Sequence, residues 1–264
     1  MGQVVFIGAG PGAADLITLR GARRLGEANV VLFDALTDPA LRELAPNARW
    51  IDVGKRGFAD STGQATINAL LVKHARESAV VVRLKGGDAS LFGRLEEELI
   101  ALADAGIACE VIPGVTAALA AAAATQRPLT RRGSGRSVSF STAMTREGAL
   151  QAGHTADTEV FYMAGKQLAA LAKRLVAAGW SADTPACVVS RAGWPDQLSS
   201  DHRVADLSHA ALLHAGRPAV VTVGAGARPV TGKTCASGAN GTNAGIATPA
   251  DAATGLASLA GSKP

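Results

Sequence analysis

Short apolar runs alternate with helical patterns through the first half of the chain. Runs rich in Val, Ile and other strand-forming residues stand at "QVVFIG", "NVVLFD", "RWIDV", "AVVVRL" and "ACEVI", and each predicts a buried strand. Between them, segments 64–77 and 93–106 carry Leu and Ile at helical spacing. Strands that alternate with helices favour an α/β fold, in which a parallel sheet is covered by helices on both faces.

The pattern changes at about residue 130. Strands are predicted at "RSVSFST", "TEVFYM", "ACVVS", "DQLSSDHRV" and "AVVTVG", but only one clear helix, "KQLAALAKRLVAAG", separates them. This favours a mixed sheet in a second domain. We therefore expect an N-terminal α/β domain at 1–113 and a C-terminal α/β domain at 114–230. The second begins with a connecting helix that Thr116 can cap.

The last part of the chain has a different composition. Residues 231–264 are dominated by Gly, Ala, Thr and Ser, as in "TGKTCASGANGTNAGIATPADAATG". Such a segment has too few large apolar residues to form a core. We expect a disordered tail that carries no chemistry.

Composition describes a globular chain of 264 residues, 48% of them hydrophobic and 18% charged. The longest apolar stretch, "GVTAALAAAAAT", is too short to cross a membrane, and the N-terminus has no basic leader, so a cytoplasmic location is expected. Cys109, Cys187 and Cys235 stand far apart. This spacing supports neither a zinc site nor a disulfide framework, and buried reduced thiols are the simpler expectation.

Basic residues gather in one loop. The net charge is +4, and the densest basic group lies in "RPLTRRGSGR". Nucleic-acid binding is not expected, because the basic residues are not interleaved with aromatic ones along a tract. An anionic small molecule fits such a local cluster better.

The opening loop, "IGAGPGAADLIT", resembles a dinucleotide fingerprint. Gly8, Gly10 and Ala13 fit G-x-G-x-x-G/A, and Asp34 follows the next apolar run. However, Pro11 removes one backbone N–H, and the helical pattern begins only near Leu16. A helix N-terminus would then not meet a pyrophosphate, so the fingerprint alone is weak evidence for NAD or FAD.

Further motifs in the chain point to another cofactor. They are "GAGPGAADLITLRGARRL", "VVLFDAL", "VGKR" at 53–56, "RLKGGDASLFGRLEEE" at 83–98, "VIPGVTAALAAAA" at 111–123, "PLTRRG" at 128–133 and "VFYMAG" at 160–165. In order and spacing, from residue 3 to about 224, they resemble the uroporphyrinogen-III C-methyltransferases, which are tetrapyrrole methylases that use S-adenosylmethionine. "VGKR" together with "LKGGD" is specific to this branch.

This resemblance implies the two-domain tetrapyrrole methylase fold. The methyl donor, S-adenosylmethionine, is then expected in the cleft between the domains, and the chain is expected to form a homodimer. Residue by residue, the resemblance assigns contacts with the donor to Pro11, Gly86, Gly87, Asp88, Leu91, Thr116, Ala117, Met163 and Ala192.

The implied reaction moves methyl groups from the donor to two pyrrole carbons of uroporphyrinogen-III, giving precorrin-2 for sirohaem or cobalamin synthesis. Asp34 and Lys55 match the family's acid/base positions. No metal is expected, since a sulfonium is already activated. The substrate carries eight carboxylates, so we expect clamps from the arginines of the motif loops, namely Arg56, Arg94, Arg131, Arg132 and Arg136.

The substrate-facing loops depart from the family pattern. The proline that normally follows "GGD" is Ala89, two glycines of "FGRGGEE" are Leu95 and Glu96, the His after "PLT" is Arg131, and the acidic start of "ENGT" is Ser190. The expected "TGH" stretch is "TAM". Three alternatives stay open. The altered loops leave room for a sister methyltransferase acting on a later corrin intermediate, and the opening fingerprint alone suggests a flavin or nicotinamide oxidoreductase. The third is a non-catalytic homologue that only binds cofactor or partner.

Overall fold

The first half of the chain forms a parallel five-stranded sheet. The structure, a computed structural model, describes residues 2–54, 63–143, 150 and 152–230. The strand order is β3-β2-β4-β1-β5, and all neighbours are parallel. The strands are β1 (Gln3–Gly8), β2 (Val30–Phe33), β3 (Arg49–Asp52), β4 (Val80–Lys85) and β5 (Ala108–Ile112).

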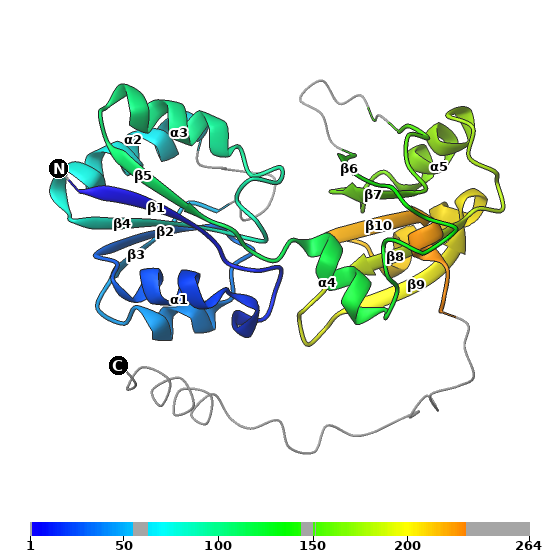
Figure 1. Cartoon of the computed structure of the whole chain (residues 1–264), viewed down its shortest axis with the longest axis horizontal. Helices are drawn as coiled ribbons and strands as arrows, with labels where there is room; N and C mark the ends of the chain where they lie inside the picture. The colour runs from blue at the N-terminus through cyan, green and yellow to red at the C-terminus, as the bar shows by residue number, and fades with distance from the viewer. Residues whose placement is uncertain (1, 55–62, 144–149, 151, 231–264) are drawn as a thin grey trace, which may run out of the picture. The chain divides into compact units, whose positions relative to one another are not determined.

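Helices cover both faces of this sheet, as predicted (Figure 1). One face packs Val5 and Ile7 of β1 against Leu25 of α1. The other packs Val4 and Phe6 of β1 against α2 and α3. Because successive side chains of a strand point to opposite faces, the continuous apolar run of β1 is buried on both sides. The helical segments are η1 (Ala14–Leu16), α1 (Leu19–Gly26), η2 (Pro39–Leu44), α2 (Gln64–Glu77) and α3 (Leu95–Asp104).

The second half forms a mixed five-stranded sheet in the order β6-β7-β10-β8-β9. Strands β6 and β7 are parallel, whereas the other neighbours are antiparallel. The strands are β6 (Val138–Thr142), β7 (Thr158–Tyr162), β8 (Pro185–Ser190), β9 (Leu198–Arg203) and β10 (Ala219–Gly224). The predicted mixed sheet is therefore confirmed.

Helical segments also cover the two faces of this second sheet. Leu171 and Leu175 of α5 pack with Phe161 on one face, and alanines of α4 pack with Val160 and Val189 on the other. The segments are α4 (Ala117–Ala124), α5 (Leu168–Ala177), η3 (Val204–His209), α6 (Ala210–Leu213) and η4 (Ala225–Ala227). Both sheets belong to one compact unit, Met1–Pro229, and a second unit begins at Val230. The expected domain boundary at 113/114 stays a prediction, and the tail at 231–264 lies outside the described residues.

Three local expectations need correction. The helical pattern near Leu16 is a short 3₁₀ turn, and the α-helix begins at Leu19, where Thr18 caps Gly21 N at 3.1 Å. Thr116 occupies the N-cap position of α4, but its side chain makes no capping hydrogen bond. Cys109 is exposed rather than buried, because β5 is an edge strand that pairs only with β1.

Candidate functional site

A cavity of about 280 Å³ lies where strands of both sheets end. The carboxyl ends of β2 and β4 reach it from the parallel sheet. From the mixed sheet it receives the ends of β7 and β8 and the start of β10, which the antiparallel pairing brings to the same edge. This is where an open α/β sheet places a ligand. The residues that line this main cavity are Pro11, Asp34, Leu36, Lys85, Gly86, Gly87, Asp88, Leu91, Phe92, Gly93, Thr116, Ala117, Tyr162, Met163, Val189, Arg191, Ala192, Trp194, Pro218, Ala219 and Val220.

Every residue predicted to contact the cofactor lines this cavity, from Pro11 to Ala192. Asp34, one of the two predicted acid/base residues, lines it as well. The other, Lys55, lies outside the described residues, and so does Arg56. The structure thus brings together side chains that are far apart in the sequence, although their roles toward a ligand stay predictions.

The two glycine-rich loops are joined by their main chains. Gly10 N donates to Gly87 O at 3.2 Å, and Gly87 N donates to Gly10 O at 2.7 Å. Both glycines have positive φ, 83° and 70°, a conformation that costs other residues free energy. This main-chain pair fixes one wall of the main cavity.

Asp88 stabilises the same wall through its carboxylate. Oδ1 accepts a hydrogen bond from Ser90 N at 2.8 Å, and Oδ2 accepts one from Gly114 N at 2.8 Å. Hydrogen bonds to an ionised acceptor are stronger than neutral ones. Asp88 therefore connects the "GGD" loop to the turn before α4, in addition to lining the cavity.

Tyr162, rather than the predicted Thr116, caps the N-terminus of α4. The Tyr162 hydroxyl accepts a hydrogen bond from Ala118 N at 3.3 Å and shares one with Thr116 Oγ1 at 2.7 Å. Burial raises the pKa of Tyr162 above its ordinary value, so the phenol stays protonated. Its ring lies 5.1 Å from that of Phe92, centroid to centroid. Neither aromatic residue was predicted from the sequence to belong to the site.

A buried ionic network lies behind Asp34. Arg83 donates from NH2 to Asp34 Oδ1 at 2.7 Å and from Nε to Glu98 Oε1 at 3.0 Å. Lys85 Nζ donates to Glu98 Oε2 at 2.7 Å. Burial lowers the pKa of Lys85, helped by the positive charge of Arg83 and opposed by Glu98. Burial also acts to lower the pKa of Arg83, but the negative charges of Asp34 and Glu98 outweigh this effect, so the pKa of Arg83 is raised.

Arg191 is a basic residue of the cavity wall that sequence reasoning missed. Its guanidinium carbon lies 4.4 Å from the ring centroid of Trp194, and Nε donates to Asp196 Oδ1 at 2.7 Å. Its position directly after β8, one residue before Ala192, was the available signal.

The other predicted arginines do not line the main cavity. Arg94 precedes α3 and pairs with Glu97, with NH2 2.6 Å from Oε2. Arg131 donates to the carbonyl of Arg228, and both Arg132 and Arg136 are exposed on the loop before β6. Their role as clamps for substrate carboxylates stays a prediction.

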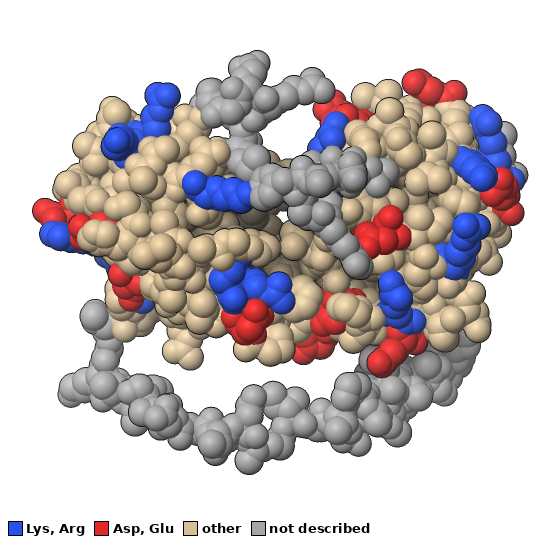
Figure 2. All heavy atoms as spheres, turned by 180° about the vertical axis from the view of Figure 1, so that it is seen from behind, with Lys and Arg blue, Asp and Glu red and all other residues tan. Residues whose placement is uncertain are grey.

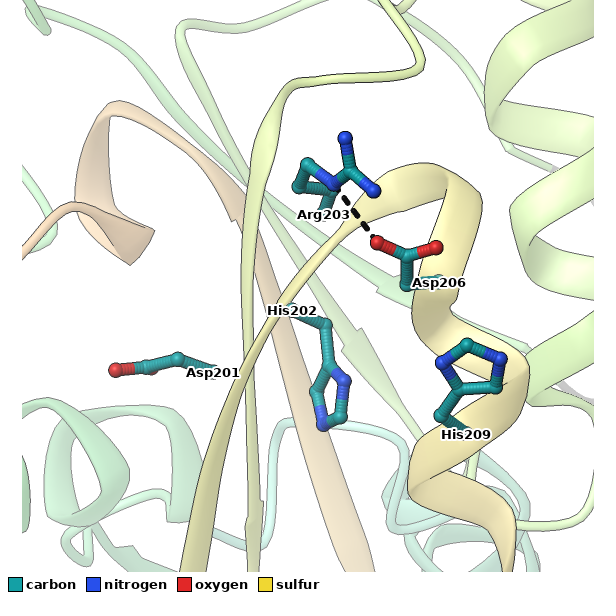
Figure 3. A pocket seen from close by; sticks show the side chains of 5 residues that line it. All are labelled: Asp201, His202, Arg203, Asp206 and His209. Atoms are coloured by element: carbon teal, nitrogen blue, oxygen red, sulfur yellow. Dashed lines mark hydrogen bonds and ion pairs between the residues drawn. The ribbon is translucent and has the colours of Figure 1, made fainter.

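A second hollow, of about 430 Å³, lies on β9 and η3. It is lined by Asp201, His202, Arg203, Asp206 and His209 (Figure 3). It is much more open, and its charges are paired: Arg203 Nε lies 2.8 Å from Asp206 Oδ2. Similar pairs occur on the face seen in Figure 2, where several Lys and Arg side chains lie beside Asp or Glu. No predicted site residue reaches this hollow, so we take the main cavity as the candidate site.

The described residues hold neither a metal-binding cluster nor a membrane-spanning helix. In that part of the chain, no group of three or more His, Cys, Asp or Glu side chains could hold a metal ion. No helix there is long and apolar enough to cross a membrane.

Comparison with known families decides the classification. Residues 3–208 match the family model of the tetrapyrrole (corrin/porphyrin) methylases. The chain belongs to this family. The match includes the whole parallel sheet, the mixed sheet except β10, and nearly all of the residues that line the main cavity. It confirms the resemblance seen in the motifs.

Two relatives differ in how much of their own length the match covers. The uroporphyrinogen-III C-methyltransferase of Pseudomonas aeruginosa is 40% identical over 232 residues, which are 84% of this chain and 93% of the relative. Siroheme synthase 1 of Pectobacterium atrosepticum is 42% identical over 231 residues. These are 84% of this chain but 48% of that relative, so the chain spans about half the length of the siroheme synthase.

Solved structures of other methyltransferases have the same fold. Uroporphyrin-III C-methyltransferase from Thermus thermophilus, complexed with S-adenosyl homocysteine, matches with a TM-score of 0.75 and 34% identity, covering 84% of this chain and 97% of its own. A cobalt precorrin-4 methyltransferase matches with a TM-score of 0.76 and 30% identity, covering 86% and 96%. The fold therefore does not distinguish between these two acceptors.

Proposed function

We propose that this tetrapyrrole methylase transfers methyl groups from S-adenosylmethionine to two pyrrole carbons of uroporphyrinogen-III and releases precorrin-2. The observation that carries the proposal is the main cavity, because every residue assigned to the methyl donor lines it. The relative from Pseudomonas aeruginosa, matched over nearly its whole length, supports uroporphyrinogen-III as the acceptor.

The cavity wall fits the chemistry of the donor. Leu91, Met163 and Ala192 offer apolar contacts, and the main chain of Gly86 offers polar groups. Gly86 packs closely on another residue of the cavity wall: a Cβ on Gly86 would approach Leu36 Cβ to 3.0 Å. When bound, S-adenosylmethionine supplies an electrophilic methyl group on a sulfonium.

The protein's own contribution is position and charge. Holding donor and acceptor in line replaces a bimolecular encounter by a positioned one. Asp34 places a carboxylate at the cavity wall, where it faces the positive charge that passes from sulfur to the macrocycle. We propose Asp34 and Lys55 as the acid/base pair that handles the proton leaving the macrocycle after each transfer.

Basic residues of this chain can bind the carboxylates of the acceptor. Arg56, Arg94, Arg131, Arg132 and Arg136 remain our proposed clamps for the acetate and propionate arms, since arginine binds carboxylates with two parallel hydrogen bonds. Arg191 joins them as a candidate, because it already lines the main cavity. A homodimer and a cytoplasmic location also remain expectations, as does the use of the product for sirohaem or cobalamin.

The decisive experiment supplies purified protein with labelled S-adenosylmethionine and enzymatically generated uroporphyrinogen-III. We expect two labelled methyl groups per macrocycle, counted by mass spectrometry. One methyl group, or more than two, contradicts the proposed product. Specific binding of NADH or FAD in place of the methyl donor contradicts the function altogether.

A sister methyltransferase of later corrin intermediates is the second candidate. It is favoured by the altered loops, "GGDAS" and "FGRLEEE", and by the equal structural match to the cobalt precorrin-4 methyltransferase. The same assay with later precorrins separates the two: methylation of one of them, with none of uroporphyrinogen-III, establishes the sister function. Tight donor binding without any turnover identifies a non-catalytic homologue.

A further inference from the structure

Three charged side chains lie inside the protein at the edge of the main cavity. Arg83 and Lys85 are both 3% exposed, and Glu98 is fully buried. Residues 83 and 85 are two positions apart on β4, so they point to the same face of the sheet. On that face α3 packs against the sheet and carries Glu98, whose two carboxylate oxygens each accept a hydrogen bond from one of these cations.

All three guanidinium nitrogens of Arg83 donate hydrogen bonds within the protein. Nε donates to Glu98 at 3.0 Å and NH2 to Asp34 at 2.7 Å. NH1 donates to the carbonyls of Leu84 at 3.2 Å and Leu32 at 3.4 Å. The guanidinium is therefore locked by contacts with β2, β4 and α3, whereas Asp34, at 30% side-chain exposure, reaches the cavity.

Such an arrangement is costly for stability alone. Taking several ions out of water costs several kcal/mol per ion, and apolar residues of similar volume often stabilise a core as well or better. The neighbouring residues of β4 are buried and apolar, namely Val81, Val82 and Leu84. The charges at Arg83 and Glu98 thus call for a reason beyond packing. Two groups of the network line the main cavity, Asp34 and Lys85, and Asp34 is the one that Arg83 holds by a hydrogen bond.

We propose that Arg83 is a positioning residue for the reaction: held from behind by Glu98, its guanidinium keeps the Asp34 carboxylate stationary at the wall of the main cavity. This inference rests on the proposed function. During each transfer the C–S bond breaks and a C–C bond forms, so positive charge moves to the macrocycle and one proton must leave it. A fixed carboxylate stabilises that charge without reorganising, and it is placed to accept the proton.

The proposal is tested by a double-mutant cycle between Arg83 and Asp34. The variants are Arg83→Gln, Asp34→Asn and the double variant, with the surface pair variant Arg203→Gln as matched control. Arg83→Gln is expected to lower kcat by roughly 10- to 100-fold, as misplacement of a reacting group does. The Kd for S-adenosylmethionine, measured by calorimetry, is expected to change less than about threefold, since Arg83 does not line the cavity.

The coupling between Arg83 and Asp34 in their effects on kcat distinguishes a positioning role of Arg83 from a merely structural one. In the Asp34→Asn background, Arg83→Gln is expected to cause almost no further loss of kcat. An equal loss in both backgrounds overturns the proposal, as does full kcat in Arg83→Gln. Arg203→Gln is expected to retain the wild-type kcat.

A second variant covers the case in which Arg83→Gln does not fold. Arg83→Lys keeps a buried cation, but a single ammonium cannot bridge Asp34 and Glu98 as the guanidinium fork does. In its crystal structure the Asp34 carboxylate is expected to leave its wild-type position, and an unmoved carboxylate overturns the positioning role whatever the activity. A wild-type chain that fails to methylate uroporphyrinogen-III contradicts the proposed function instead, so the two failures are distinguishable.

Discussion

Backbone strain collects around the main cavity at the scale of single residues. Phe92, Met163 and Arg191 have positive φ values of 55°, 57° and 51°, and all three line the cavity. The left-handed conformation costs a non-glycine residue about 1–2 kcal/mol. Strain of this kind persists where the surrounding structure and a function require a particular side chain direction.

Met163 offers a direct test of this strain. Met163→Gly is expected to raise the free energy of unfolding by about 1 kcal/mol, because glycine adopts a positive φ without penalty. For a chain of this size the gain corresponds to roughly 2–4 °C in Tm. The same variant is expected to weaken the binding of S-adenosylmethionine, since an apolar side chain of the cavity wall is lost.

Met163→Ala is the matched control for this prediction. It removes the same side chain but keeps a Cβ, so weaker donor binding is expected without the gain in Tm. Thermal unfolding and calorimetry measure the two effects separately. Equal Tm values for the two variants would mean that the positive φ stores no strain.

Among the elements, the two glycine-rich loops depend on close main-chain approach. A Cβ on Gly114 would lie 2.3 Å from Gly87 O and 2.7 Å from Gly8 Cα. Neither neighbour is the end of a flexible side chain, so the main chain itself would have to move. The loop after β1, the loop after β4 and the turn before α4 therefore hold one another in place.

Gly114→Ala is expected to destabilise the protein by about 2 kcal/mol or more, in the range of overpacking substitutions, and to abolish measurable donor binding. Gly106→Ala is the control. Gly106 also has a positive φ, 68°, but a Cβ there meets nothing within 4 Å. It is expected to cost about 1 kcal/mol and to leave the Kd for S-adenosylmethionine unchanged. A Gly114→Ala variant with wild-type affinity would refute the close-approach argument.

Three predicted strands have the bounds that the structure shows, two of them buried and one, β5, at the edge of its sheet. The predicted strands 3–8, 108–112 and 219–224 agree with β1, β5 and β10 residue for residue, because apolar runs between turn signals leave few alternatives. The start of α1 was placed too early. The structure begins the helix at Leu19, after the loop has turned back toward Gly193, whose carbonyl accepts from Ala13 N at 2.9 Å.

Parts of the site could not be read from the sequence for a physical reason. Pro11 and Gly87 were assigned to the site by the resemblance of their motifs to those of the methyltransferase family. Arg83 lies in a strand, and only tertiary contact with Glu98 and Asp34 explains a charge at a buried position. Tyr162 and Arg191 likewise enter the site through pairing of strands that are distant along the chain.

For the molecule as a whole, buried histidine links stability to pH. His214 is fully buried, and its ring nitrogens lie 2.8 Å from Ser190 Oγ and 2.9 Å from Ser200 Oγ. Burial lowers the pKa of His214, with further lowering from His202 and Arg217. Burial also lowers the pKa of His74. The folded protein therefore favours both rings in their neutral form.

The sign of the pH effect follows from proton linkage. The unfolded chain binds protons at His214 at a higher pH than the folded chain does, so stability rises with pH in this range. We expect Tm to fall as the pH is lowered below about 6.5, the ordinary pKa of histidine. His214→Gln is expected to reduce this slope, whereas a substitution of the exposed His209 by Gln is not. A slope unchanged by His214→Gln would exclude His214 as a cause.

The hydrogen bonds between Gly10 and Gly87 have a consequence for how such enzymes diversify. They join main-chain atoms, so they are indifferent to which side chains occupy "AS" in "GGDAS" or "LE" in "FGRLEEE". We therefore expect mutations in those loops to alter which macrocycle is accepted, while the wall that we assign to the methyl donor keeps its shape. Related proteins can thus evolve specificity for new acceptors while they still bind the methyl donor.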